Sequence, residues 1–207
     1  MFHDRTDAGN KLAEALSELK NARPVVITIP RGGLPVGAAI AAALDAPLDI
    51  ALAKKIGHPL NREFAIGAVS PEHLIVEKPQ GISGAYLEDE VQRLRKTLES
   101  RHALFYKKVK PLSLTGRTVI LTDDGMATGN TLRVTAKLIA SAQPEKVVVA
   151  VPVGPSESVR SLDEMDEVDG VICLETPHDF MAVGQYYEEF PQVTDQTAVV
   201  ILEKARA

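Results

Sequence analysis

Two adjacent carboxylates in the middle of the chain are the residues best suited to do chemistry. Asp123 and Asp124 follow the apolar run Val119–Leu121 after a single threonine, and a stretch rich in glycine and threonine continues to Thr131. Helical spacing begins at Asn130, so the stretch leads into a helix N-terminus, whose unpaired amides and positive dipole end attract phosphate. Glycines let backbone amides approach phosphate oxygens closely, and threonine hydroxyls can donate to them.

The two carboxylates need a different partner, because like charges repel and a phosphate would avoid them. They suit sugar hydroxyls or a metal ion beside the phosphate. A ligand that carries a phosphate close to a cis-diol is a ribose 5-phosphate. The alternative is that the Asp and Thr residues only cap a helix that follows a strand. The order of the whole segment Val119–Thr131, in which every part has a compatible role, favours a ligand site.

Two further loops carry positive charge after apolar strands. In Pro30-Arg31-Gly32-Gly33 the guanidinium of Arg31 offers planar donors for a diphosphate, and the glycines expose backbone amides. An ordinary strand-to-helix turn has the same composition, so this motif is weak when taken alone. The other loop begins at Lys54 and Lys55, either of which could neutralise a diphosphate. The alternative is a pair of solvated lysines at a strand end.

The segment Thr176–Pro191 gathers aromatic side chains in a chain that is only 4% aromatic. Phe180 could stack on a flat heterocycle, and backbone groups from Met181 to Val183 could bind the edge of such a ring. Packing of Phe180 onto the sheet is an equally good interpretation. Packing is the favoured interpretation for three other aromatic residues: Tyr186, Tyr187 and Phe190.

The elements that must position these loops alternate between strands and helices. The predicted strands are Val25–Ile29, Leu48–Ala53, Val119–Leu121, Lys146–Val151 and Val171–Leu174. The predicted helices are an N-terminal helix capped by Thr6 or Asp7, then Pro35–Leu44, Tyr86–Tyr106, Asn130–Ser141, Glu157–Met165 and Thr194–Arg206. Lys54–Ser83 is rich in glycine and proline and predicts a loose hairpin, with apolar runs at Phe64–Val69 and Leu74–Val76.

This alternation favours an α/β fold with a doubly wound parallel sheet, formed by one domain over residues 1–207. In such sheets ligands bind where strands end at their carboxyl edge. Four segments are expected at that edge: the loops after Ile29, Leu121 and Leu174, and the excursion that begins at Lys54.

The segment Val119–Thr131 resembles the motif with which type I phosphoribosyltransferases bind 5-phosphoribosyl-1-pyrophosphate (PRPP). The resemblance extends along most of the chain and is closest to uncharacterised bacterial phosphoribosyltransferase-like proteins. They share similar Pro-Arg-Gly-Gly, Glu-Phe-Ala-Ile-Gly-Ala-Val and Asp-Phe-x-Ala-Val-Gly-x-Tyr-Tyr stretches. It implies that Asp123 and Asp124 hold the ribose hydroxyls and contact Mg²⁺ only indirectly. The other residues that it implies for PRPP are Gly125, Ala127, Thr128, Gly129, Asn130 and Thr131.

The resemblance also implies roles for the other loops. It assigns pyrophosphate binding to Arg31, Gly32, Gly33, Lys54 and Lys55, and a strained or cis peptide bond to Arg31–Gly32. It implies a flexible loop over about 54–83 and a small C-terminal hood over about 176–191. The hood would bind the acceptor through Phe180, Met181 and Val183. The implied catalytic residues are Arg31, Lys55, Asp123 and Asp124.

The implied reaction displaces pyrophosphate from C1 of PRPP, with Mg²⁺ as cofactor and usually a ring nitrogen as nucleophile. Enzymes for 6-oxopurines usually have Asp where Ala127 stands, and a lysine that Val151-Pro152-Val153 does not supply. The acceptor is therefore left open. One alternative function is a PRPP-binding regulator without essential catalysis, and another is a phosphohydrolase or related enzyme of the same fold. No Gly-x-Gly-x-x-Gly follows the first strand, so a dinucleotide-dependent oxidoreductase is discounted.

Composition limits the partners. The net charge of −5, from 23 basic and 28 acidic residues, gives no reason to expect nucleic acid, and Lys107-Lys108-Val109-Lys110 is the sole dense basic run. Cys173 is the only cysteine, which fits a reducing compartment. No apolar run is long enough for a membrane span, and the first residues do not resemble a secretory signal, so a cytoplasmic location is expected. The family habit favours a homodimer.

Overall fold

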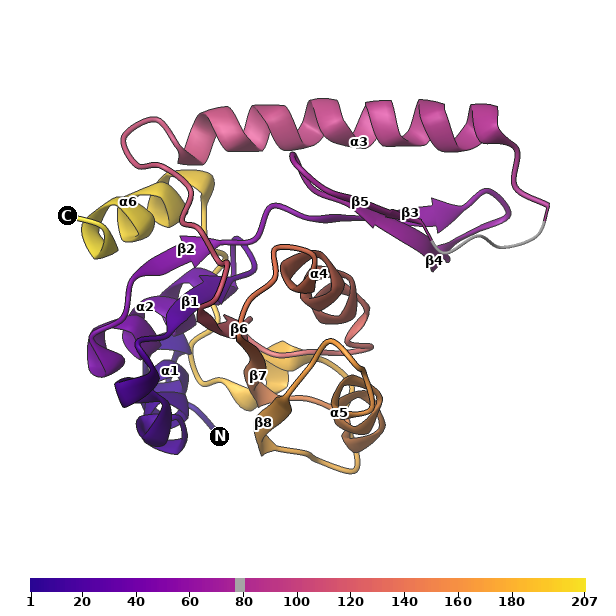
Figure 1. The fold of residues 1–207 in the computed structure, drawn as a ribbon. Helices are drawn as coiled ribbons and strands as arrows, with labels where there is room; N and C mark the ends of the chain where they lie inside the picture. Colours follow the sequence, from indigo (N-terminus) through magenta and orange to yellow (C-terminus); the bar gives the residue numbers. More distant parts are fainter. Residues whose placement is uncertain (77–80) are drawn as a thin grey trace.

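A five-stranded parallel sheet forms the centre of the protein. The computed structural model describes residues 1–76 and 81–207. The strands lie in the order β2-β1-β6-β7-β8, and every neighbouring pair is parallel (Figure 1). Their bounds are β1 Val25–Thr28, β2 Leu48–Ile50, β6 Thr118–Thr122, β7 Lys146–Val153 and β8 Gly170–Glu175. The α/β fold with a parallel sheet is therefore confirmed.

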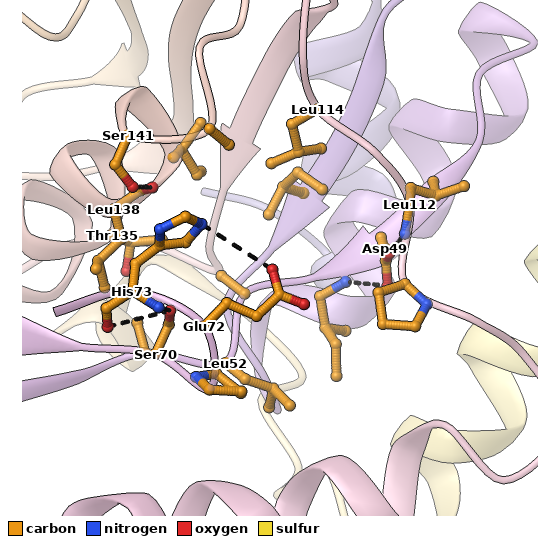
Figure 2. Close-up of a pocket in the computed structure, with 18 of the residues that line it drawn as sticks. Asp49, Leu52, Ser70, Glu72, His73, Leu112, Leu114, Thr135, Leu138 and Ser141 are labelled. Atoms are coloured by element: carbon orange, nitrogen blue, oxygen red, sulfur yellow. Dashed lines mark hydrogen bonds and ion pairs between the residues drawn. The ribbon is translucent and has the colours of Figure 1, made fainter.

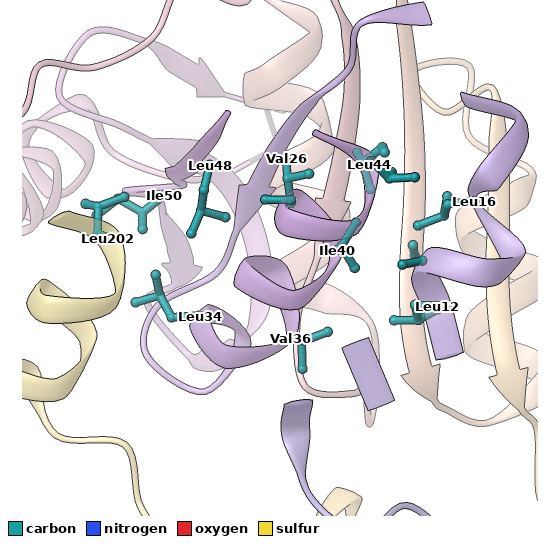
Figure 3. Packing of buried hydrophobic residues seen from close by; sticks show 14 of the residues in the cluster. Leu12, Leu16, Val26, Leu34, Val36, Ile40, Leu44, Leu48, Ile50 and Leu202 are labelled. Carbon is teal, nitrogen blue, oxygen red and sulfur yellow. The ribbon is translucent and has the colours of Figure 1, made fainter. Parts of the chain in front are cut away.

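Helices cover both faces of this sheet because alternate strand residues point to opposite sides. Val26, Ile120 and Val148 pack in one cluster with three helices: α1 Arg5–Ala15, α2 Gly33–Leu44 and α6 Asp195–Ala205 (Figure 3). The neighbouring strand residues Val25, Val119 and Val147 pack in a second cluster against α4 Asn130–Ala140 and α5 Ser156–Asp163. Continuous apolar strands such as Val25–Thr28 are typical of parallel sheets buried on both faces.

The excursion after β2 is a small sheet of its own. The strands β3 Lys54–His58, β4 Asn61–Val69 and β5 Leu74–Val76 pair antiparallel in that order. The long helix α3 Gly84–Phe105 lies over this sheet, which extends away from the main one (Figure 1). The predicted hairpin corresponds to β4 and β5, which pair antiparallel at the two apolar runs, but the excursion also contains β3 and is not loose. A separate apolar cluster joins β3 and β4 to α3: Ile56, Ile66, Val69, Val91, Leu94 and Leu98.

Within the predicted flexible loop 54–83, residues 77–80 lie outside the described part of the chain. The other differences from the predicted elements are local. Asp4 caps α1 by accepting a hydrogen bond from the Asp7 amide, so neither Thr6 nor Asp7 is the cap. The predicted irregular segment contains the short 3₁₀ helix η2 Val183–Tyr186, and another, η1 Ser17–Ala22, follows α1. No helix in the described part of the chain is long and apolar enough to cross a membrane.

The strand order reverses direction between β1 and β6, which neighbour each other in the sheet although α2 and the whole excursion separate them in sequence. Crevices at such switch points are where open α/β sheets bind ligands. The loops that leave β1 and β6 begin side by side here, since the Ile29 amide donates to the Thr122 carbonyl oxygen at 3.0 Å. The fold thus brings together the two segments that carry the predicted chemistry.

Candidate functional site

The loop after β1 lies directly against the two carboxylates after β6. A Cβ atom on Gly32 would lie 2.2 Å from Asp124 Oδ2, and one on Gly33 would lie 3.0 Å from Asp123 Oδ1. Only glycine permits this approach at position 32 without displacement of its neighbour. The cis peptide bond in this loop is Pro30–Arg31, so its predicted position one residue later, at Arg31–Gly32, was wrong.

Asp123 is the deeper of the two carboxylates. Its Oδ1 accepts a hydrogen bond from the Asp124 amide at 2.9 Å. Burial, together with the negative charge of Asp124, raises the pKa of Asp123 well above its ordinary value. A ligand that donates hydrogen bonds to this carboxylate would stabilise its charged form, as sugar hydroxyls do.

Asp124 is held by a partner that the sequence did not reveal. Arg5 Nε donates to Asp124 Oδ2 at 2.9 Å, and both side chains are largely buried. The hydroxyl of Tyr187 donates to the main-chain oxygen of Asp124 at 2.7 Å. Burial raises the pKa of Asp124 in spite of Arg5, which acts in the opposite direction. Arg5 therefore orients this carboxylate and favours its ionised form.

Arg5 also joins the acidic pair to the C-terminal segment. Its guanidinium carbon lies 3.7 Å from the centroid of the Phe190 ring, and Nη1 donates to the Pro191 carbonyl oxygen at 2.7 Å. Phe190 packs on Tyr187 as predicted, with ring centroids 4.9 Å apart, but it also lines the site cavity described below. No motif surrounds Arg5, so only the folded chain shows this connection.

The glycine- and threonine-rich loop ends at an open helix N-terminus. Gly129 is the N-cap of α4 with φ of 68°, and no side chain caps the first turn. Ala127 and Thr128 are exposed, and Thr131 lies on the first turn of α4 and lines the site cavity. Gly125 has φ of 149°, and a Cβ there would lie 2.7 Å from Val183, which brings the hood against this loop. The Asn130 amide makes a long hydrogen bond of 3.5 Å to Thr128 Oγ1, and the N-cap Gly129 has no side chain to cap the first turn, which suits a phosphate site.

A cavity of about 590 Å³ opens between these elements. Its acidic wall is Asp124, and Thr131 and Phe190 also line it. The lining includes four positively charged side chains: Arg5, Arg31, Lys54 and Arg101. Such an excess of positive charge suits a polyanion such as a diphosphate.

Two of these arginines converge on the start of α6. Asp195 Oδ1 forms an ion pair with Arg31 Nη1 at 3.6 Å and a shorter contact with Arg101 Nη1. Arg101 lies on α3, among many charged residues of an amphipathic helix, so no sequence pattern distinguishes it from them. Asp195 thus holds two guanidinium groups at the cavity.

The two predicted lysines are placed differently. Both belong to β3, and Lys54 lines the cavity, whereas Lys55 is not among its lining residues. The predicted acceptor residues also lie outside that lining. Phe180 stacks on Tyr186 with centroids 5.7 Å apart and rings 8° from parallel, and Met181 is 80% exposed. Tyr187 is buried against Phe2, which confirms its predicted packing role.

Comparisons with known proteins identify the family of the chain. Residues 2–189 match the family model described as a phosphoribosyl transferase domain. The fold and this match define the class: the chain belongs to the phosphoribosyltransferase family. The segment Val119–Thr131 resembles the corresponding motif of type I members of this family.

Particular relatives are similar along nearly the whole chain. The curated "Putative phosphoribosyl transferase Rv0571c" of Mycobacterium tuberculosis H37Rv is 37% identical over 210 residues, which cover 99% of this chain and 47% of that protein. A counterpart in strain CDC 1551 has the same values. The chain thus spans about half the length of the curated relatives that it matches.

Two solved structures share the fold. Protein TT1426 from Thermus thermophilus is 39% identical with a TM-score of 0.92, and the match covers 99% of this chain and 98% of that one. The AQ2163 protein from Aquifex aeolicus is 18% identical with a TM-score of 0.50, over 82% of this chain and 73% of that one. The second likeness concerns the fold alone.

Proposed function

We propose that this chain binds PRPP together with Mg²⁺ and transfers its 5-phosphoribosyl group to a nitrogenous acceptor, with release of pyrophosphate. The observation that carries the proposal is the meeting of three features at one edge of the sheet. These are the buried acidic pair, the uncapped N-terminus of α4 and the glycine loop with Arg31. They match the three parts of PRPP: a cis-diol, a phosphate and a diphosphate.

Each part of the ligand has its own set of residues under this proposal. Asp123 and Asp124 accept hydrogen bonds from the ribose hydroxyls, and the loop that ends at Thr131 binds the 5-phosphate. Arg31, Lys54 and Arg101 line the cavity, where their charges would neutralise a pyrophosphate. Lys55, also in β3, stays a predicted pyrophosphate contact, as Gly32 and Gly33 do through their amides.

Mg²⁺ fits the site as an ion carried by the substrate. Among the described residues, no group of three or more His, Cys, Asp or Glu side chains could hold a metal ion alone. Magnesium keeps several waters and binds substrate phosphates, so the ion would be held mainly by the pyrophosphate and the ribose hydroxyls, and Asp123 and Asp124 would act on it only through those hydroxyls. When bound, such an ion neutralises charge on the leaving pyrophosphate.

The protein's contribution to the reaction is then positioning and electrostatic stabilisation. The cations around the cavity stabilise the negative charge that develops on pyrophosphate as the bond to C1 breaks. The ionised acidic pair fixes the ribose ring so that C1 faces the acceptor. Phe180, Met181 and Val183 of the hood are the proposed acceptor residues, and Val183 already lies against Gly125.

A binding assay tests the first half of the proposal. Isothermal titration of PRPP with MgCl₂ should give saturable binding, and Asp124→Asn should weaken it by about tenfold or more, because a charged hydrogen bond acceptor is lost. Asp163→Asn, at the exposed end of α5, is the matched control and should leave affinity unchanged. Absence of PRPP binding to the wild type would refute the proposal.

A turnover assay tests the second half. A panel of nucleobases and small amines is incubated with PRPP and Mg²⁺ while pyrophosphate release is measured. Release with one acceptor, lost in Asp124→Asn, supports transfer. PRPP binding without release on any acceptor would instead favour the PRPP-binding regulator. Family habit adds the expectation of a homodimer, which sedimentation of the same sample would test.

A further inference from the structure

A second cavity, of about 440 Å³, lies on the face of the sheet that α4 covers only in part (Figure 2). Its walls come from the C-terminal half of α4, the turn between β4 and β5, the end of α3 and the loop 111–115. Asp49 of β2 and Ile27 of β1 face it. A volume of this size is typical of small-molecule sites.

Asp49 holds the surrounding walls in place. Its carboxylate accepts hydrogen bonds from the Tyr106 hydroxyl at 2.8 Å and from the Leu112 amide at 2.7 Å, and Arg206 lies 3.5 Å away. The side chain is 4% exposed, so these partners hold a buried charge. One residue thereby ties the end of α3 and the loop before β6, two of the cavity's walls, to the sheet.

One polar group in the wall is buried without a partner. Thr135 of α4 lines the cavity and is 1% exposed, and its Oγ1 has no hydrogen-bond partner within the described part of the chain. Buried hydroxyls are normally hydrogen-bonded, so an unsatisfied one beside a cavity indicates a place for a ligand atom. The surrounding wall is apolar and includes Leu114, Leu138 and Ile139.

The side chains that line this cavity carry the opposite net charge to those of the cavity of about 590 Å³ proposed to bind PRPP, called the PRPP cavity below. Its described lining contains Asp49 and Glu72 with two histidines, His73 and His102, and includes no lysine or arginine. The PRPP cavity is lined by four such cations. Asp49 is already paired with Arg206, so Glu72 gives the lining its remaining negative charge, which disfavours a phosphorylated ligand and admits a neutral or positively charged one.

We propose that this second cavity is a separate binding site for a neutral or positively charged nitrogen heterocycle of one or two rings. Thr135 and the carboxylate of Glu72 supply its polar contacts, and the aliphatic wall covers its ring faces. The site goes beyond the proposed transferase reaction, since none of the residues assigned to PRPP or to the acceptor lines it.

Three probes with one ring system test the charge preference. Benzimidazole, 2-aminobenzimidazole and benzimidazole-5-carboxylate are titrated into the full chain without PRPP and followed by ligand-observed NMR. The first two should bind and the carboxylate should not. Equal binding of all three, or binding of none, would overturn the proposal.

Variants locate the probe. Thr135→Val keeps the shape but removes the hydroxyl, and should weaken benzimidazole by about threefold to tenfold. Ser113→Phe fills the exposed rim of the cavity and should abolish binding, whereas Phe180→Ala in the hood should have no effect. Glu72 is an exposed residue, so Glu72→Gln is expected to fold, and should weaken only the cationic 2-aminobenzimidazole. If Phe180→Ala abolished benzimidazole binding and Ser113→Phe did not, the probe would bind at the hood, and the proposed site would be refuted.

Discussion

Replacing Arg5 with methionine removes three interactions at once while it keeps a long apolar side chain. The lost contacts are the hydrogen bond to Asp124, the hydrogen bond to the Pro191 carbonyl oxygen and the stacking on Phe190. The most important consequence concerns Asp124, which stays in a largely buried position without its counter-charge.

The size of the effect follows from burial. The side chains of Arg5 and Asp124 are 9% and 17% exposed. Loss of one partner from a buried ion pair costs about 3–5 kcal/mol, and the partial exposure of Asp124 places this pair at the lower end, about 3 kcal/mol. The stacking on Phe190 adds about 0.5–1 kcal/mol. We therefore expect Arg5→Met to lower the free energy of unfolding by about 3–4 kcal/mol near pH 7.

The interaction free energy between Arg5 and Asp124 can be measured by urea denaturation of four proteins: wild type, Arg5→Met, Asp124→Asn and the double variant. In the Asp124→Asn background Arg5→Met should cost only about 1 kcal/mol, because no charge is stranded. The folded-state pKa of Asp124 lies above its unfolded value and rises further without Arg5, so the deficit of Arg5→Met should shrink as pH falls toward the unfolded pKa of about 3.9. Equal costs in both backgrounds, at every pH, would refute the ion-pair reasoning.

Three further predictions concern the same sheet edge and its neighbours. Asp123→Asn should raise the free energy of unfolding of the ligand-free protein in EDTA near pH 7, because burial raises the folded-state pKa of Asp123. This gain in stability, measured by urea denaturation, should vanish as pH falls below the unfolded pKa of the carboxyl group. A gain that is the same at every pH would contradict the prediction. Gly32→Ala should cost about 1–3 kcal/mol and weaken PRPP binding, because the new Cβ would lie 2.2 Å from Asp124 Oδ2. Thermal unfolding and titration with PRPP measure both effects. Gly84→Ala is the control, because no atom lies within 4 Å of the added Cβ, and it should leave PRPP binding unchanged and stability unchanged or slightly higher. Burial raises the pKa of Cys173 to about 11, so iodoacetamide at pH 8 should alkylate the folded protein about a hundredfold more slowly than the urea-unfolded chain; similar rates would show that the thiol is accessible and ionised.

The main sheet and the acidic segment were predictable because both depend on local pattern. Buried parallel strands are short apolar runs, and such runs lie within one or two residues of the observed bounds for β1, β6 and β8. The segment Val119–Thr131 has its chemistry in sequence order, so the strand end, the acidic pair and the helix start could be placed without tertiary information.

The missed features depend on contacts between distant parts of the chain. Arg5 reaches Asp124 across 119 residues, and Arg101 meets Asp195 across 94, so neither pair produces a local pattern. The hairpin prediction located the runs that form β4 and β5 but missed β3, because the cover of α3 over β3 and β4 holds that strand in place. The length of a glycine-rich segment does not reveal that cover.

The segment Ala51–Ala53 is a wall that the two cavities share. These three residues line the proposed PRPP cavity on one side and the second cavity on the other, and the Ala51 amide is fixed to the Thr28 carbonyl oxygen at 2.9 Å. If occupancy of one cavity shifts this shared wall, the affinity of the other changes by some factor. Thermodynamic linkage then requires reciprocity, so PRPP must alter the affinity for the heterocycle by the same factor. A single backbone segment of three residues would set the coupling free energy between the two sites.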